Sequence, residues 1–255
     1  MELRKTFNED EVNYDLYRPG YADALYQDIF RCAALPEKGA VLEIGIGTGQ
    51  ATLPFLQKNC EVTGAELGDR LSAFVRDKYS AYPNFRCVTG DFMELPFPEQ
   101  SFDLIFSATA FHWLPFEAAL QKVRSLLKPA GTVALFWNHP FPNRPEDPTN
   151  AASKRVYDAL RPSSKEQAEF SEAQLSVWKE RLQQAGFSDV QTFLYRRVRT
   201  LRTEQYLGLI NTYSDHRALA PDPKAAFESE MQKAIDAEGG FIRIYDTMDL
   251  YLGRM

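Results

Sequence analysis

Val41-Leu-Glu-Ile-Gly-Ile-Gly-Thr-Gly-Gln50 joins a short apolar run to three closely spaced glycines. Residues 40–44 predict a buried strand, and the glycines stand where that strand turns into a helix. Glycine lets the backbone adopt positive φ angles and approach a ligand, and a helix amino terminus offers free N–H donors. The spacing is GxGxG, not the GxGxxG of dinucleotide-binding turns, which favours an amino acid carboxylate over a pyrophosphate. The segment therefore predicts a ligand-binding strand-to-helix turn.

Outward from this turn, short β-like runs alternate with amphipathic stretches of helical length. This alternation is typical of an α/β fold in which helices cover a parallel sheet. The runs are rich in β-branched or aromatic residues and too short for buried helices; they cover residues 40–44, 61–66, 85–89, 102–107 and 132–137. The helical stretches cover residues 51–57, 70–79 and 116–127, and a further helix, 21–34, precedes the first strand.

After residue 137 the regular alternation stops. Asn138-His-Pro-Phe-Pro-Asn-Arg-Pro-Glu-Asp-Pro148 has four prolines in eleven residues, which predicts a loop or an extended connection. Beyond it we expect helices at 172–185, 203–212 and 223–237 and strands at 189–195 and 241–252. The chain is therefore expected to form one domain that comprises an amino-terminal lid and helix (1–34), a ligand-binding core (35–137) and a carboxyl-terminal part (138–255) with a helical insertion at about 196–237.

The composition argues against several classes of function. The 255 residues include 29 basic and 35 acidic side chains, a formal charge of −6, which disfavours binding to nucleic acid backbones or anionic membranes. Arg196-Arg-Val-Arg-Thr-Leu-Arg202 is a candidate basic patch, although its alternation favours the solvated face of a strand. Residues 1–12 lack the apolar centre of a secretory signal, and no apolar run approaches the ~20 residues that cross a bilayer. We therefore expect a cytoplasmic protein without nucleic acid or membrane partners.

Cysteine and histidine usage argues against a metal site. Cys32, Cys60 and Cys87 are odd in number, widely spaced and form no CxxC pair, so they are expected to be reduced thiols. The 3 histidines are too few for a multi-histidine centre. We therefore expect no metal.

Two acidic residues follow later strands at the same edge of the predicted sheet. Glu66 ends the second strand, where an acidic side chain reaches ribose hydroxyls in doubly wound folds. Asp91 follows the third strand, and its carboxylate is suited to accept a hydrogen from an adenine amino group, with the Phe92 N–H near a ring nitrogen. Because ligands of open α/β sheets bind outside the carboxyl ends of the strands, the glycine turn and these residues predict one nucleoside-binding site.

These segments resemble the class I S-adenosylmethionine (SAM) dependent methyltransferases. The matching motifs are E-x-G-x-G-x-G ending at Gly49, Glu66, Gly90-Asp-Phe92, Ser101-Phe-Asp-Leu-Ile105 and Leu126-Leu-Lys-Pro-Ala-Gly-Thr132. The sequence is similar in particular to the small-molecule branch (methyltransferase type 11-like) that includes trans-aconitate methyltransferase. Its members often have a Tyr-x-x-x-Arg-Pro-x-Tyr segment, here Tyr14 to Tyr21, and Phe-His-Trp after the fourth strand, here residues 111–113.

The resemblance covers residues 14–137 closely and the remainder loosely. It implies a Rossmann-like fold, in which helices flank a seven-stranded, mostly parallel sheet, with a helical insertion near the carboxyl terminus. It also implies SAM as cofactor, S-adenosylhomocysteine (SAH) as product, and methyl transfer to an oxygen, nitrogen or carbon of a small-molecule acceptor, with a carboxylate as one candidate. The residues implied to bind the cofactor are Tyr17, Arg18, Glu43, Gly45, Gly47, Thr48, Gly49, Gln50, Glu66, Leu67, Asp91, Phe92 and Ala108. The candidate acceptor pocket comprises Tyr14, Tyr21, His112, Trp113, Trp137 and Tyr213.

The sequence allows two roles for His112. An imidazole just beyond the fourth strand is suited to hydrogen-bond the acceptor or remove its proton. The alternative is a histidine packed beside Trp113 or the cofactor. A carboxylate acceptor is nucleophilic already and would need no base.

Three other functions are alternatives to a small-molecule methyltransferase. A nicotinamide-dependent oxidoreductase predicts GxGxxG, which is not present, and leaves Asp91 and Phe92 without a role. A noncatalytic SAM-binding protein would keep the cofactor residues without turnover. A methyltransferase acting on RNA or protein is disfavoured by the acidic balance and by the lack of an appended basic module.

Overall fold

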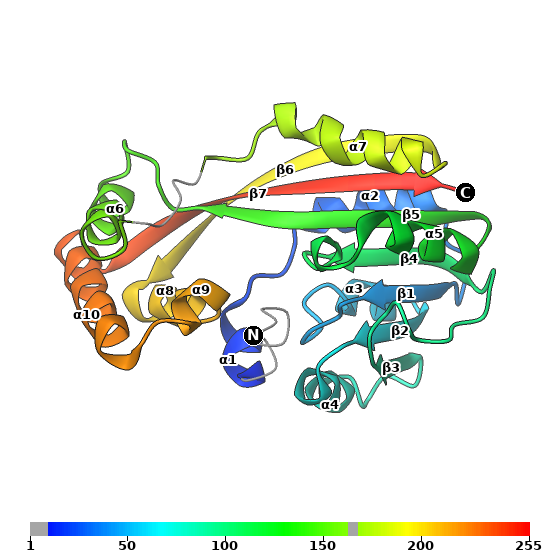
Figure 1. The fold of residues 1–255 in the computed structure, drawn as a ribbon, viewed down its shortest axis with the longest axis horizontal. Helices are drawn as coiled ribbons and strands as arrows, with labels where there is room; N and C mark the ends of the chain where they lie inside the picture. The colour runs from blue at the N-terminus through cyan, green and yellow to red at the C-terminus, as the bar shows by residue number, and fades with distance from the viewer. Residues whose placement is uncertain (1–9, 163–167) are drawn as a thin grey trace.

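The computed structural model describes residues 10–162 and 168–255. Its centre is a seven-stranded sheet in the order β3-β2-β1-β4-β5-β7-β6 (Figure 1). The strands β1 to β5 are parallel, whereas β7 runs antiparallel to both β5 and β6. This Rossmann-like arrangement confirms the predicted fold class. The strands are β1 (Ala40–Ile44), β2 (Glu61–Glu66), β3 (Phe85–Thr89), β4 (Phe102–Ala108), β5 (Leu127–Phe141), β6 (Ser188–Arg202) and β7 (Phe241–Arg254).

Helices cover both faces of the sheet. On one face α2 (Asp23–Ala33), α3 (Leu53–Gln57) and α4 (Asp69–Lys78) pack their apolar side chains, among them Leu25, Phe55 and Val75. On the other face α5 (Phe116–Leu126) and α7 (Leu175–Gln184) contribute Leu120 and Leu182. The parallel strands are therefore buried on both sides, as their continuous apolar sequence predicts.

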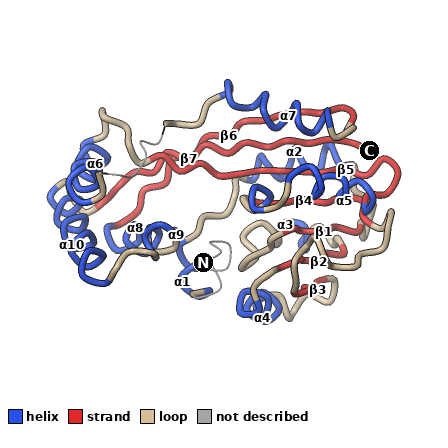
Figure 2. The backbone as a smooth tube through the Cα atoms, viewed as in Figure 1, coloured by secondary structure: helices blue, strands red, loops and turns tan. Residues whose placement is uncertain are grey.

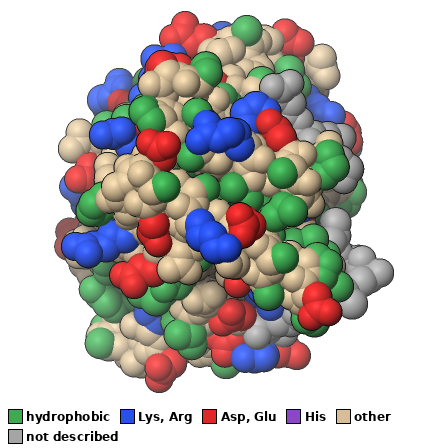
Figure 3. All heavy atoms as spheres, turned by 90° about the vertical axis from the view of Figure 1, so that its left-hand side faces the viewer, with side chains coloured by type: hydrophobic (Ala, Val, Ile, Leu, Met, Phe, Trp, Pro, Cys, Tyr) green, Lys and Arg blue, Asp and Glu red, His purple; other side chains and the backbone are tan. Residues whose placement is uncertain are grey.

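The last three strands extend well beyond the parallel core (Figure 2). The antiparallel pairing of β6 with β7 runs from the Ser188 and Arg254 pair to the Arg202 and Phe241 pair. At its far end, helices pack around a separate apolar cluster that includes Phe227 and Met231. These helices are α6 (Pro148–Leu160), α8 (Thr203–Ile210), α9 (Ser214–Arg217) and α10 (Pro221–Ala237). Figure 3 shows acidic and basic side chains interspersed on the face of the molecule at this end.

The segment 138–148, predicted as a loop or an extended connection, is extended at its start, and a helix that was not predicted follows it. Residues 138–141 continue β5 and pair with β7, although Pro140 lacks a backbone donor. The strand has by then passed the end of β4, so Pro140 lies at an edge, where proline is tolerated. Residues 148–160 form α6, whose N-cap Asp147 accepts a hydrogen bond from Thr149 N, with proline in the first turn. This Asp-Pro signature is typical of a helix start.

Two further boundaries differ from the sequence prediction. The lid segment contains a helix, α1 (Glu11–Tyr17), that was not predicted. The helical insertion expected to begin at about 196 begins instead at Thr203, because residues 196–202 continue β6. The side chains at 196, 198 and 200 are exposed, as the alternation predicted, but Arg197 and Arg199 turn inward.

Residues 1–9, on which most of the expectation about a leader rests, lie outside the described residues. Within the described ranges, no helix combines the length and the apolar character that a membrane span requires.

Candidate functional site

The glycine turn after β1 adopts the left-handed backbone that its sequence predicts. Gly45, Gly47 and Gly49 have φ angles of 70°, 58° and 81°. A Cβ atom on Gly45 would lie 2.5 Å from the Ala110 Cβ, whereas on Gly47 its nearest neighbour would be the Tyr14 ring at 3.9 Å. Gly45 is therefore required for close packing against the β4 loop, and Gly47 faces open space.

Gly49 has a structural role. A Cβ atom there would lie 2.6 Å from the Tyr79 ring, and the Tyr79 hydroxyl donates to Gly49 O at 2.7 Å. Thr48 is buried beside it. Thr48 and Gly49 therefore pack on the side of the turn away from the cavity and do not line it.

Glu66 connects two loops at the carboxyl edge of the sheet. Its Oε2 accepts from Gly47 N and its Oε1 from Gly68 N, both at 2.9 Å. Burial raises the pKa of this carboxyl, and the backbone donors oppose the shift. The carboxylate is thereby held in one orientation beside the glycine turn.

Glu43 lies deeper in the same cavity. It is buried, and the Thr52 hydroxyl donates to its Oε2 at 2.6 Å. Burial raises the pKa of Glu43 to about 8. Near neutral pH this carboxyl is therefore largely protonated, and a cation brought beside it would favour its ionised form.

A lysine of α5, Lys122, holds the loop after β3, and no sequence motif had marked it as a site residue. Asp91 Oδ1 accepts from Met93 N at 2.9 Å. Lys122 Nζ donates to three carbonyl oxygens of this loop, those of Phe92, Met93 and Leu95, at 2.7, 3.1 and 2.7 Å. A charged donor with three backbone acceptors fixes the conformation of the loop and hence the position of the Asp91 carboxylate.

A cavity of about 320 Å³ joins these loops. Most of the predicted site residues line it; they are Tyr14, Arg18, Tyr21, Glu43, Gly45, Gly47, Gln50, Glu66, Leu67, Asp91, Phe92, Ala108, His112, Trp113 and Tyr213. Tyr17, predicted to contact the cofactor, packs against Gly208 and does not line the cavity. Trp137, predicted in the acceptor pocket, does not line the cavity. It contacts a lining residue instead, because its Nε1 donates to His112 Nδ1 at 3.0 Å.

The amino-terminal segment covers one side of this cavity. The Lys78–Asp15 and Arg70–Glu11 ion pairs, at 2.6 and 2.9 Å, tie α1 to α4. The Arg18 guanidinium lies between the Tyr14 and Tyr213 rings, 5.1 and 4.6 Å from their centroids. The segment predicted as a lid thus consists of α1 and the strap, residues 18–22, which connects α1 to α2. Both bring aromatic and cationic side chains to the cavity.

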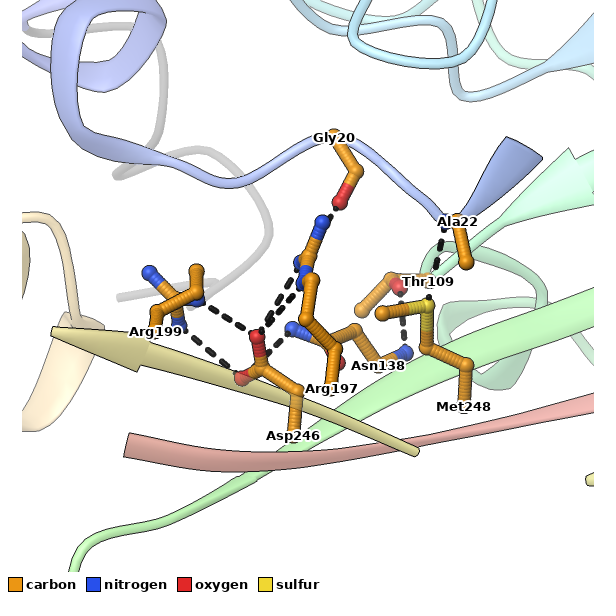
Figure 4. A network of polar contacts seen from close by, with 8 residues as sticks. All are labelled: Gly20, Ala22, Thr109, Asn138, Arg197, Arg199, Asp246 and Met248. Atoms are coloured by element: carbon orange, nitrogen blue, oxygen red, sulfur yellow. Dashed lines mark hydrogen bonds and ion pairs between the residues drawn. The ribbon is translucent and has the colours of Figure 1, made fainter. Parts of the chain in front are cut away.

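The strap between α1 and α2 is anchored on the long strands (Figure 4). Arg197 donates to Gly20 O at 3.0 Å and, with Arg199, contacts the buried Asp246 carboxylate. Asn138 Nδ2 also donates to Asp246, at 3.3 Å. Two guanidinium groups offset the cost of burying this carboxylate. The candidate basic patch is therefore in part an internal ion-pair network next to the cavity.

Thr109 and Asn138 line the cavity but were not predicted as site residues. Thr109 has a φ of 55° directly after β4, and its Oγ1 lies 2.6 Å from the Tyr21 hydroxyl. A non-glycine residue in the left-handed region often marks a functional turn. No sequence signal identified Thr109, whereas Asn138 was part of the segment predicted as a loop or an extended connection.

A second cavity of about 620 Å³ adjoins the first, with which it shares Arg18, Pro140 and Tyr213. It lies among the helices at the end of the long strands, and Tyr157 and His216 line it. Among the described residues, no cluster of three or more His, Cys, Asp and Glu side chains is placed to hold a metal.

Comparison with known proteins gives matches to methyltransferases. Residues 42–135 match the model of the methyltransferase domain. The chain is 26% identical over 230 residues to an uncharacterized methyltransferase-like protein of Schizosaccharomyces pombe, which covers 90% of this chain and 85% of that one. It is 30% identical to a malonyl-[acyl-carrier protein] O-methyltransferase of Halorhodospira halophila, but the match covers 51% of this chain and 46% of the relative.

Solved structures agree in fold. A protein described as a type II methyltransferase from Anaeromyxobacter dehalogenans superposes with a TM-score of 0.66 at 19% identity, covering 93% of this chain and 98% of that one. A phosphoethanolamine N-methyltransferase 2 of Haemonchus contortus, solved with S-adenosyl-L-methionine, gives a TM-score of 0.56 at 14% identity, over 97% of this chain and 57% of that one. At sequence identities of 19% and 14%, these likenesses show the fold alone.

Proposed function

The chain belongs to the class I SAM-dependent methyltransferases, and on that basis we propose that it transfers the sulfonium methyl group to a small-molecule acceptor. Oxygen, nitrogen and carbon are the candidate attacked atoms, and we favour an anionic acceptor such as a carboxylate. A noncatalytic SAM-binding protein and a methyltransferase of RNA or protein are the alternatives. The narrower likeness to the trans-aconitate methyltransferase branch stays a prediction.

The cavity suits the three parts of this cofactor. Its volume, about 320 Å³, lies within the ~300–1,000 Å³ typical of ligand pockets. Each Glu66 oxygen accepts one backbone N–H and keeps a lone pair for a ribose hydroxyl. We assign Asp91 and the Phe92 N–H to adenine, Gly45 and Gly47 to the methionine part, and Glu43 to its ammonium.

The residues of the cavity act by placing two reactants and excluding water. The chemistry that bound SAM supplies is an electrophilic methyl group on a sulfonium, which leaves a neutral thioether. Tyr14, Tyr21 and Tyr213 line the cavity, and the faces of aromatic rings favour a positive charge such as that of the sulfonium. In-line placement of two reactants supplies much of the rate enhancement for such a transfer.

Arg18 supports an anionic acceptor. Within the described part of the chain its guanidinium bonds Thr212 O at 3.0 Å, and its Nε is buried without a hydrogen-bond partner. An arginine that lies between two aromatic rings and has no carboxylate partner among residues 10–162 and 168–255 is suited to bind a carboxylate. The malonyl-[acyl-carrier protein] O-methyltransferase among the relatives is consistent with methylation of an oxygen. The adjoining second cavity, which also borders Arg18, leaves room for the rest of the acceptor.

The orientation of Glu66 by the Gly47 N–H is the observation that carries the proposed cofactor site. Calorimetric titration with SAM tests it. We expect Glu66→Ala to weaken binding at least tenfold, because a buried carboxylate with paired donors is lost. Glu61→Ala, at the exposed opposite end of β2, is the matched control and should bind like the wild type. Equal affinity of the Glu66 variant and the control would refute the site.

A further inference from the structure

The protonation of the His112 ring is constrained by the indole of Trp137, which can donate a hydrogen bond but cannot accept one. His112 lies in the short helix Phe111–Trp113 that follows β4, and Trp137 lies on β5. The Trp137 Nε1 donates to His112 Nδ1 at 3.0 Å. An indole nitrogen carries a hydrogen and has no acceptor capacity. Nδ1 must therefore be the unprotonated nitrogen, and the ring hydrogen is on Nε2.

The same contact disfavours a second proton on the ring. An imidazolium would direct its Nδ1–H at the indole N–H, two donors facing each other. Partial burial of the ring and the charge of nearby His139 also lower the pKa of His112, although the residue as a whole is exposed. His139 in turn lies 3.0 Å from the buried Asp249. His112 is therefore held neutral, in a single tautomer.

Trp137 is itself held firmly. Its side chain is 6% exposed, and its ring is stacked on Trp178 with centroids 4.5 Å apart. Its backbone N donates to Asp249 Oδ1 at 3.1 Å. Rotating the indole away from His112 would break this packing, so the constraint on His112 is part of the folded structure.

The other edge of the His112 ring is turned to the cavity. Trp137 contacts the Nδ1 edge of the ring, and it does not line the cavity, whereas His112 does. The opposite edge, which carries Nε2, therefore faces the cavity. Among residues 10–162 and 168–255, no acceptor for Nε2 is found. The hydrogen on Nε2 is therefore available to a bound molecule.

We propose that His112 binds the methyl acceptor as an Nε2–H donor and does not act as a base, so that the enzyme takes acceptors whose attacking atom is already ionised. This inference rests on the proposed function. Two tyrosines that line the same cavity, Tyr21 and Tyr213, are also unsuited to act as bases near neutral pH. Burial raises the pKa of Tyr21 and of Tyr213 above the usual tyrosine range.

A carboxylate fits this arrangement in a defined way. One of its oxygens accepts from His112 Nε2, which steers the other oxygen to the methyl carbon. The new bond joins that oxygen to the methyl carbon, and the bond from this carbon to sulfur breaks, with its electron pair remaining on sulfur. The acceptor loses its negative charge and the sulfonium its positive charge, and no proton is transferred.

Nitrogen NMR of the histidine rings tests the tautomer without any acceptor. The chain has 3 histidines, and His112→Gln assigns the His112 signals by their loss. At neutral pH we expect an unprotonated Nδ1 and a protonated Nε2, with protonation of the ring displaced to a lower pH than that of an ordinary histidine. Trp137→Phe, which removes the indole donor, should let His112 sample both tautomers and titrate at a higher pH. A protonated Nδ1 in the wild type, or its titration near neutral pH, would overturn the proposal.

Turnover supplies the second readout, with an acceptor identified by labelled-methyl transfer. His112→Gln keeps a side-chain N–H and has no basicity, whereas His112→Leu has neither. We expect the leucine variant to lose about tenfold or more in kcat/KM and the glutamine variant to retain most of it. Equal loss in both variants, with unchanged SAM affinity, would show that a base is required. Failure of SAM to bind the wild type would instead overturn the proposed function and leave the NMR result intact.

Discussion

Glu43→Gln gives a quantitative test of the electrostatics at the base of the cavity. Burial raises the pKa of Glu43 from 4.5 to about 8, so between these values the folded state holds a proton that the unfolded chain releases. Its contribution to the free energy of unfolding is fully present below about pH 4.5 and is lost as the pH rises to about 8. Glutamine keeps an oxygen that can accept from Thr52 and does not titrate.

The size of the effect follows from the two pKa values. Relative to the wild type, the variant should gain about 1 kcal/mol at pH 5, about 3 kcal/mol at pH 7 and about 4 kcal/mol at pH 8. Urea unfolding at each pH measures these differences. Glu61→Gln, on the exposed end of β2, is the control and should stay within about 0.5 kcal/mol of the wild type. A difference between the Glu43 variant and the wild type that does not change with pH would refute the reasoning.

The remaining predictions concern the loops around the cavity. Lys122→Met removes the donor to three carbonyls and should weaken SAM binding about tenfold by calorimetry, with unchanged affinity as the contrary result. Asp246→Asn removes the buried counter-charge of two partly buried guanidinium groups and should cost about 3–5 kcal/mol of stability; a loss below about 1 kcal/mol would contradict the ion-pair account. Gly45→Ala should destabilise the protein more than Gly47→Ala, because only the first adds a 2.5 Å clash to the ~1–2 kcal/mol of left-handed backbone strain; equal losses of melting temperature would argue against that packing.

The parallel core could be predicted from sequence because each element carries its own signal. The bounds of β1, β2 and β3 coincide with the predicted ranges, since short β-branched runs between turn signals leave little freedom. β5 was longer than predicted, because Pro140 usually excludes a strand and is tolerated here only by its place at an edge. That place depends on where β4 ends, which no local pattern encodes.

The candidate site was predictable where residues are close in sequence to a strand end. The glycine turn and Asp91 line the same cavity, as the shared edge of a parallel sheet requires. The contacts that decide the chemistry join distant segments, such as Trp137 to His112 and Lys122 to the loop after β3. Sequence spacing alone does not orient an indole toward an imidazole, so the choice between base and donor required the structure.

Transfer of a labelled methyl group tests the central claim most directly. Wild-type protein and Glu66→Ala would be incubated with SAM labelled on its methyl group and a cell extract, and small molecules would then be separated from macromolecules. We predict label in an anionic small molecule with the wild type and at most background with the variant. Label confined to RNA or protein, or no label at all with SAM shown to bind, would contradict the account.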